Sequence, residues 1–242
     1  MLLLIDTDIL LYKAIASTEE EINWGDDIWT LFTDLKQSKK VFQLQLDTIK
    51  EKLNSDDILC CLSDPSDNFR KHIAPTYKSN RKGTRKPVGY AALRDWVKDN
   101  YPSLAKPTLE ADDVMGIMAT KPDNIGKVVV VSDDKDMRTI PTKIYAPMRD
   151  ELFEIRPAQA DAFFFEQTLK GDPVDGYSGC KGVGEKTAAK ILGTRPAWSS
   201  VEQAFLKAGM TKEDALTQAR LARILRWEDY NHQTGEVILW HP

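Results

Sequence analysis

Three short apolar runs, each followed closely by an aspartate, constrain the fold of this chain more than any other feature of its sequence. Runs of this length predict buried strands, and the helical spacing of apolar residues between them favours an α/β fold with a mostly parallel central sheet flanked by helices. Because the carboxyl ends of parallel strands lie at one edge of a sheet, we expect these aspartates to converge. The runs are residues 2–5, 58–62 and 127–131, and the aspartates that follow them are Asp6, Asp64 and Asp134.

The remaining periodicity predicts where the helices and weaker strands lie. Residues 143–146, 152–155 and 236–240 are the weaker strand candidates, and Thr211 with Asp214 resembles a helix-capping pair. Strands alternate with helices up to residue 156, whereas the rest is mostly helical. We therefore expect an α/β core over residues 1–156 and a helical region with a C-terminal tail over residues 157–242. The expected helices are residues 27–53, 89–100, a segment from about Glu110, 158–170, 185–192 and 211–227.

The composition indicates a folded protein without a membrane segment. The chain has 242 residues, of which 42% are hydrophobic and 29% charged, which is enough apolar material for a buried core. No apolar run approaches the roughly 20 residues that a membrane helix needs, and Asp6 and Asp8 interrupt the apolar start, so we expect no signal peptide. Three cysteines without a CxxC pair favour reduced thiols in a cytoplasmic protein.

The acidic residues near the predicted strand ends point to a metal site. Two carboxylates about 5 Å apart repel each other by roughly 3 kcal/mol at an effective dielectric constant near 20, so a cluster of them is unstable without cations. Hard oxygen ligands suit Mg²⁺ or Mn²⁺, and two such ions can activate a water and stabilise a leaving oxygen in phosphoryl chemistry. The candidates beside Asp6, Asp64 and Asp134 are Asp8, Glu110, Asp112, Asp113, Asp136, Asp172 and Asp175.

Each of these acids taken singly is more simply interpreted as a solvated surface side chain, and the argument rests on the set. Glu110 and Asp113 share a face of a regular helix, whereas Asp112 would point elsewhere. Asp133 and Asp134 compete for one role, and the spacing to Asp136 favours Asp134.

A basic connector joins the second predicted strand to the next helix. Between Arg70 and Lys86 there are seven Lys or Arg residues and no Asp or Glu, and Tyr77 lies among them. Cations with interleaved aromatic rings suit a path for single-stranded nucleic acid, although a solvated basic loop is the alternative. The seven residues are Arg70, Lys71, Lys78, Arg81, Lys82, Arg85 and Lys86.

Residues 179–188 carry the most specific local motif. Gly182 and Gly184 permit a tight turn and a close approach of a phosphate backbone, and the helix that follows begins with free N–H groups. Lys181 and Lys186 add positive charge. The motif predicts a helix-hairpin-helix contact with a phosphate backbone.

These motifs together resemble the 5′-nuclease family, which includes flap endonucleases and the 5′-nuclease domain of bacterial DNA polymerase I. The motifs occur in the family's order over about residues 1–195. The tail and residues 86–90 are similar, more narrowly, to the 5′–3′ exonucleases of short-tailed lytic bacteriophages. Thr7 departs from the Gly that many relatives have there, and the connector is short compared with that of cellular flap endonucleases.

The resemblance implies a PIN-like core and a role for each site residue. Asp6, Asp64, Glu110 and Asp112 would hold a first Mg²⁺ or Mn²⁺. Asp112, Asp134, Asp136 and Asp175 would hold or approach a second, with Asp113 and Asp172 assisting. Lys78 and Arg81 would act at the scissile phosphate, and a potassium ion would bind backbone carbonyls of the 182–187 turn. The expected DNA contacts are Arg70, Tyr77, Lys82, Lys86, Lys181, Gly182, Gly184, Lys186 and Thr187.

The resemblance also implies the activity. We expect a monomer that hydrolyses phosphodiester bonds near the 5′ ends of duplex or flapped DNA, and RNA in RNA–DNA hybrids. In a phage setting this activity would serve replication, recombination and host-DNA breakdown in the bacterial cytoplasm. Two alternatives stay open: a PIN-like ribonuclease, which the 182–187 hairpin disfavours, and a non-catalytic DNA-binding module, which the dense carboxylates disfavour.

Overall fold

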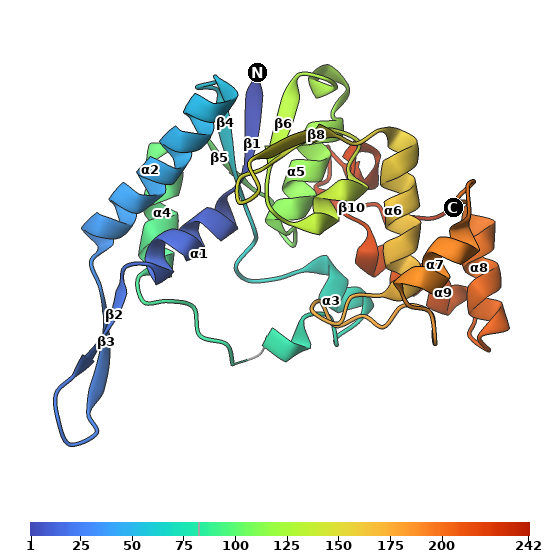
Figure 1. Cartoon of the computed structure of the whole chain (residues 1–242), viewed down its shortest axis with the longest axis horizontal. Helices are drawn as coiled ribbons and strands as arrows, with labels where there is room; N and C mark the ends of the chain where they lie inside the picture. The colour runs from blue at the N-terminus through green and yellow to red at the C-terminus, as the bar shows by residue number, and fades with distance from the viewer. Residues whose placement is uncertain (82) are drawn as a thin grey trace.

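A six-stranded sheet forms the centre of the computed structural model, which describes residues 1–81 and 83–242 (Figure 1). The strand order is β5-β4-β1-β6-β7-β8; β8 pairs antiparallel with β7, and the other neighbours pair parallel. This is the mostly parallel α/β sheet predicted from the sequence. The strands are β1 Leu2–Asp6, β4 Ile58–Leu62, β5 Ser103–Ala105, β6 Val128–Val131, β7 Lys143–Ala146 and β8 Glu151–Glu154.

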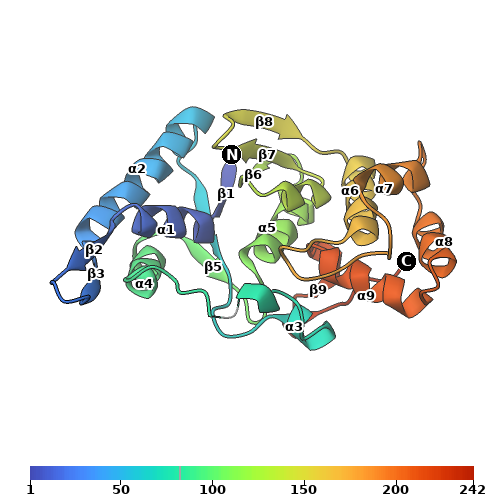
Figure 2. The same ribbon diagram turned by 60° about the horizontal axis from the view of Figure 1, so that its bottom comes forward.

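Helices cover both faces of the sheet, as the alternating side chains of β1 require. Leu3 and Ile5 face one core, which Phe42 and Leu93 complete, whereas Leu4 faces a second core on the opposite side. Figure 2 shows α1, α2 and α4 together on one side, with α5 on the other. The helices of this part are α1 Thr7–Ala16, α2 Leu35–Leu53, α3 Phe69–Ile73, α4 Tyr90–Asn100 and α5 Ala111–Thr120.

β1 lies between β4 and β6, and this places the predicted strand ends side by side. Asp6 is in register with Cys61 of β4, and Ile5 is in register with Val131 of β6. The chain leaves all three strands at the same edge of the sheet. The segments after β1, β4 and β6 therefore share one region of the molecule, as their sequence positions predicted.

The helix predicted over residues 27–53 is wrong in its first part. The chain instead forms an antiparallel hairpin of β2 (Glu19–Asn23) and β3 (Trp29–Thr33), which projects from the body in Figure 1. Gly25, Asp26 and Asp27 all have positive φ, so they turn the chain where a helix would need negative φ. The aromatic and β-branched residues of β3 favour a strand. α2 begins only after Asp34, whose side chain accepts hydrogen bonds from the first free N–H groups.

The second half is helical, with one shortened element. The capping pair of Thr211 and Asp214 is present, but the helix predicted to reach residue 227 ends at Ala222. Beyond it the backbone is extended because its polar groups bind elsewhere in the protein: the N–H of Leu225 donates to Asp113. The predicted strand at 236–240 is short, Glu236–Val237 (β10), and pairs with β9, Tyr230–Asn231. The helices are α6 Pro157–Lys170, α7 Glu185–Leu192, α8 Trp198–Lys207 and α9 Lys212–Ala222; α1, α3 and α8 had no counterpart among the predicted helices.

The C-terminal tail returns to the α/β core. Ile224, Leu225 and Tyr230 are buried against Leu4 and Val130 of the sheet. The division at residue 156 stays a proposal, and the tail beyond α9 packs with the first part of the chain. Across residues 1–81 and 83–242, no helix combines the length and the apolar composition needed to span a membrane.

Candidate active site

A cavity of about 300 Å³ lies at the carboxyl edge of the sheet. Acids and bases from five separate stretches of the chain meet there: the end of β1, the connector, the start of α5, the turn after β6 and the loop after α6. The titratable residues that line it are Asp6, Asp8, Lys78, Arg81, Glu110, Asp112, Asp134, Lys135, Asp136, Asp172 and Asp175.

Asp6 connects the ends of two neighbouring strands. It ends β1 and caps α1, and its Oδ2 accepts a hydrogen bond of 2.7 Å from Oγ of Ser132, directly after β6. Burial raises the pKa of Asp6 to about 7, and the negative charge of Asp8 adds to the shift, although the Ser132 hydrogen bond opposes it. Asp8 accepts hydrogen bonds from the N–H of Ser63 and from the hydroxyl of Tyr90.

The start of α5 contributes Glu110 and Asp112, and it turns Asp113 into the protein interior. Glu110 is the N-cap, so its backbone is not helical and counting helix faces from it fails. Burial raises the pKa of Asp112 well above its usual value, and the nearby Asp134 and Asp6 add to the rise. The helix-face count that turned Asp112 elsewhere is therefore wrong, whereas Asp112 lines the cavity, as the role implied by the resemblance requires.

A 3₁₀ turn, Lys135–Thr139, presents the pair after β6. Asp134 caps the turn by accepting a hydrogen bond of 2.8 Å from the N–H of Asp136. Burial and the charge of Asp134 raise the pKa of Asp136 to about 7, while Gln167 of α6 donates to its carboxylate. Asp133 lies elsewhere and pairs with Lys13, which agrees with the preference for Asp134.

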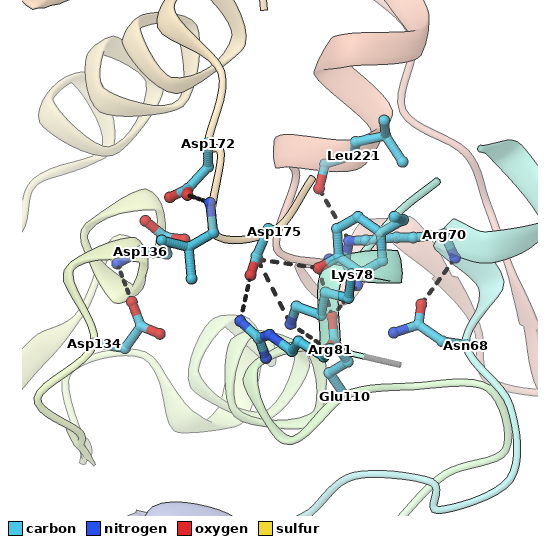
Figure 3. Close-up of polar contacts among 12 residues, drawn as sticks. Asn68, Arg70, Lys78, Arg81, Glu110, Asp134, Asp136, Asp172, Asp175 and Leu221 are labelled. Carbon is cyan, nitrogen blue, oxygen red and sulfur yellow. Dashed lines mark hydrogen bonds and ion pairs between the residues drawn. The ribbon is translucent and has the colours of Figure 1, made fainter. Parts of the chain in front are cut away.

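The loop after α6 supplies Asp172 and Asp175, which meet different cations. Asp172 pairs with Lys135 at 2.7 Å, whereas Asp175 pairs with Arg81 at 2.7 Å. Figure 3 shows Asp175 between the Asp134–Asp136–Asp172 group and the group around Glu110. The loop is closed at its base by Gly171 and Gly179, whose backbones touch so closely that neither position has room for a Cβ.

Lys78 supplies a partly buried positive charge between two carboxylates. Its Nζ lies 2.5 Å from Oε1 of Glu110 and 3.5 Å from Oδ2 of Asp175. Burial alone would raise the pKa of Glu110, but the cations of Lys78 and Arg70 outweigh it and lower the pKa to about 2. Glu110 is therefore held ionised, in contrast to Asp6 and Asp136.

Two predicted metal ligands lie outside this cavity. Asp113 is fully buried and forms a two-point ion pair with Arg70, so its oxygens are already satisfied. Asp64 accepts hydrogen bonds from the backbone and hydroxyl of Ser66 and from the N–H of Thr108. These bonds lower the pKa of Asp64 to about 2, with the Ser66 hydroxyl as the largest cause. Neither side chain lines the cavity in this arrangement, and their part in holding a cation stays a prediction.

The predicted DNA contacts also divide into exposed and buried groups. Arg70 and Tyr77 are buried, which contradicts the expectation that they touch DNA. Lys86 is exposed, with its Nζ 4.3 Å from the centre of the Tyr90 ring. Lys82 lies outside the described residues. The group that begins α7 is exposed to solvent throughout: Lys181, Gly182, Gly184, Lys186 and Thr187.

Among the charged residues that line the cavity, Lys135 was not among the predicted site residues, although its neighbours were. It stands between Asp134 and Asp136. Its position follows from the strand-end argument, since a turn that presents its first and third residues to the cavity also brings the residue between them close. Asp8, two residues after Asp6, was a candidate acid without an assigned role, and it lines the cavity.

The donor chemistry of the cavity suits hard divalent cations, although three of its acids, Glu110, Asp172 and Asp175, are paired with basic side chains in this arrangement. Within the described ranges, no group of three or more His, Cys, Asp or Glu side chains is arranged to hold a metal ion. Lys78, Arg81 and Lys135 instead pair with the carboxylates that ions would bind. The pKa values of Asp6 and Asp136 are raised first by burial and further by neighbouring carboxylates, and oxygen-seeking cations would relieve that repulsion.

Comparison with known proteins adds a family and a fold. A family model described as 5′-3′ exonuclease, N-terminal resolvase-like domain, matches residues 1–161. The exodeoxyribonuclease of Enterobacteria phage T3 is 31% identical and the exonuclease of Escherichia phage T7 is 32% identical; each alignment covers 100% of this chain and 93% of the relative. The T5 D15 protein crystallised with metal ions has the same fold, with a TM-score of 0.67 and 16% identity over 91% of this chain and 88% of that one.

Proposed function

Since the chain belongs to the 5′–3′ exonuclease family and is a 5′–3′ exonuclease/flap endonuclease, we propose that it hydrolyses DNA with two divalent cations bound in the cavity. One observation carries this proposal. Eight carboxylates line the cavity and only three cationic side chains accompany them. Such an excess of charge beside a polyanionic substrate is unfavourable unless further cations bind.

We assign the carboxylates of the cavity to two neighbouring cations. Asp6 and Glu110 would hold one cation, and Asp134, Asp136, Asp172 and Asp175 the other, with Asp112 shared between the two and Asp8 beside Asp6. Two divalent cations bound there would activate a water and stabilise the leaving oxygen, with Mg²⁺ and Mn²⁺ as the ions that suit such ligands. Lys78, Arg81 and Lys135 would give up carboxylate partners as the cations bind.

Lys78 and Arg81 would then be free to bind substrate. Both lie on or beside the 3₁₀ turn Ser79–Arg81 and already reach into the cavity. A guanidinium and an ammonium placed at the scissile phosphate stabilise the charge that develops on its oxygens during hydrolysis. No histidine lines the cavity among the residues described, so the proposal assigns no imidazole base.

The start of α7 would hold the duplex. Gly182 has a φ of +76° and open space beyond its Cα, so the turn exposes backbone N–H groups at the head of a helix. Lys181 and Lys186 flank that turn and are exposed. Lys86 and Lys82 of the connector would contact the strand nearer its 5′ end. A solved complex of the T5 D15 flap endonuclease contains DNA and metal ions, which supports a DNA substrate for this chain.

Several finer parts of the proposal rest on the family resemblance. They are cleavage of RNA in RNA–DNA hybrids, a potassium ion on the carbonyls of the 182–187 turn, a monomeric state and action in the cytoplasm of an infected bacterium. The biological roles that follow are primer removal, recombination and breakdown of host DNA.

The test is cleavage of 5′-labelled nicked duplex, 5′-flap and RNA–DNA hybrid substrates in Mg²⁺, with product lengths read on a gel. We expect short products from the 5′ end, abolished by EDTA. Asp134→Ala and Asp175→Ala should abolish cleavage while DNA binding persists. Cleavage of single-stranded RNA alone would favour the ribonuclease alternative, and EDTA-insensitive binding without cleavage would favour the binding module.

A further inference from the structure

Arg70 lies at a junction of three segments that are distant in sequence. It belongs to α3 at the start of the connector, and it reaches the N-terminus of α5 and the chain leaving α9 (Figure 3). Its side chain is only 3% exposed. A buried arginine at such a position cannot bind a DNA phosphate, so its charge serves another purpose.

Every N–H group of the Arg70 guanidinium has a partner. Nε donates to the carbonyl of Leu221 and Nη2 to the carbonyl of Arg223, both at the end of α9. Nη1 and Nη2 each donate to one oxygen of Asp113 at 2.7 Å. The second N–H of Nη1 donates to Oε2 of Glu110 at 3.2 Å. Only a planar fork with five donors satisfies this set.

Glu110 is the partner that lines the cavity. Its Oε2 also accepts a hydrogen bond of 2.8 Å from the hydroxyl of Tyr77, whereas its Oε1 is contacted by Lys78. One oxygen is therefore fixed from the protein interior, and the other faces the cavity group. The orientation of this carboxylate is set by Arg70 and Tyr77 on its inner side.

We propose that Arg70, assisted by the Tyr77 hydroxyl, is a positioning residue that holds Glu110 ready for a divalent cation and ties this carboxylate to the end of α9. The inference rests on the proposed function, since it assigns Glu110 to a cation. Partners that orient a ligand from behind typically change metal affinity about 10- to 100-fold when they are removed. Asp113 has a structural part in this arrangement, because it anchors the guanidinium.

The test is Mn²⁺ binding to the metal-free protein, followed by electron paramagnetic resonance of free Mn²⁺, together with kcat and KM for a nicked duplex. Arg70→Lys keeps the charge beside Asp113 but lacks the fork that reaches Glu110. We expect Mn²⁺ affinity to fall about tenfold or more, kcat to fall, and KM for DNA to stay within about twofold. Tyr77→Phe, which preserves the packing, should lower Mn²⁺ affinity in the same direction by a smaller factor.

Arg226→Lys is the matched control. Arg226 is also a buried arginine, with bonds to the carbonyl of Thr139 and to Asp161, and it does not line the cavity. We expect this variant to lose thermal stability but to bind Mn²⁺ like the wild type. If Arg70→Lys matches Arg226→Lys in both thermal stability and Mn²⁺ affinity, then Arg70 has only a structural role and the inference is overturned.

Two further outcomes separate the inference from the function on which it rests. Wild-type protein that neither binds Mn²⁺ nor cleaves DNA would refute the proposed function itself. If Arg70→Lys fails to fold, as judged by circular dichroism, Tyr77→Phe decides: wild-type Mn²⁺ affinity in that variant overturns the inference.

Discussion

Arg81 and Asp175 form an ion pair at 2.7 Å, which joins the connector to the loop after α6. Lys78 reaches the same carboxylate at 3.5 Å and Glu110 at 2.5 Å. In the absence of bound cations these two basic side chains neutralise the acids that they would leave during catalysis. Under the proposed mechanism, their charge would compete with metal ions for the carboxylates and would act together with the ions at the phosphate.

Lys78→Met and Arg81→Met should each slow cleavage by about 10²- to 10³-fold, because a charge at the developing phosphate oxygens is lost. Mn²⁺ affinity should not fall in either variant, since a competitor for Glu110 or Asp175 has been removed. Single-turnover cleavage and Mn²⁺ titration measure the two effects. Lys13→Met is the control, as Lys13 pairs with Asp133 away from the cavity. Cleavage at the wild-type rate in Lys78→Met would remove Lys78 from the mechanism.

The buried acids make the stability of the cation-free protein depend on pH. The pKa of Asp6 and that of Asp136 are each raised from 3.8 to about 7, by burial first and by neighbouring carboxylates second. Between these pH values the folded protein holds protons that the unfolded chain has lost, so stability falls as pH rises from about 4 to about 7. In EDTA, the melting temperature should fall over that range, with a flatter profile in Asp6→Asn.

Added Mg²⁺ should reverse this trend. Cations bind the ionised carboxylates, so the rise in melting temperature at saturating Mg²⁺ should be larger at pH 8 than at pH 5.5. Differential scanning fluorimetry with and without Mg²⁺ measures both slopes. A melting temperature that rises with pH in EDTA through the same window would contradict the raised pKa values of Asp6 and Asp136.

The sheet and most of the site were predictable because both follow from local pattern. Apolar runs specify strands, and parallel strands bring their carboxyl ends together, so the sequence alone was enough to place Asp6 and Asp134 in one site. The hairpin at residues 19–33 was missed because the apolar residues of 28–35 also fit a helix face. The turn residues Gly25, Asp26 and Asp27 decide between the two interpretations.

The misplaced residues share one physical cause. Whether a charged side chain faces the cavity depends on partners that are remote in sequence. Asp113 pairs with Arg70, and Asp64 accepts hydrogen bonds from Ser66 and Thr108, so neither side chain lines the cavity. The sequence of the basic connector likewise suggests that all its cations are exposed. Arg70 is nevertheless buried, because its guanidinium donates hydrogen bonds to Asp113 and to two backbone carbonyls at the end of α9. Spacing along the chain carries no information on such pairings.

Gly171→Ala should disrupt the loop that carries Asp172 and Asp175. A Cβ at residue 171 would meet the backbone of Ser178 and Gly179, and φ is +69° there. Gly126→Ala is the matched control, because φ is +74° at that glycine but nothing lies within 4 Å of its Cβ position. Crowding should make Gly171→Ala less stable than the control by about 1–3 kcal/mol in urea unfolding, with cleavage also reduced. If the two variants lose the same free energy of unfolding, then the positive φ alone, and not crowding, determines the effect at residue 171.

Lys181→Ala and Lys186→Ala should weaken DNA binding without affecting the cavity. Both side chains are exposed beside the start of α7, so each neutralises a phosphate only when duplex is bound. Each substitution should lower the slope of log Kd against log salt by about 1 and raise KM, while kcat at saturating DNA stays near the wild-type value. Fluorescence anisotropy of a labelled duplex across a salt series measures the slope. Lys98→Ala, an exposed lysine on α4, controls for the loss of one positive charge and should leave the slope unchanged. A salt slope equal to that of the wild type in both α7 variants would exclude this turn from the duplex contact and leave the connector to carry it.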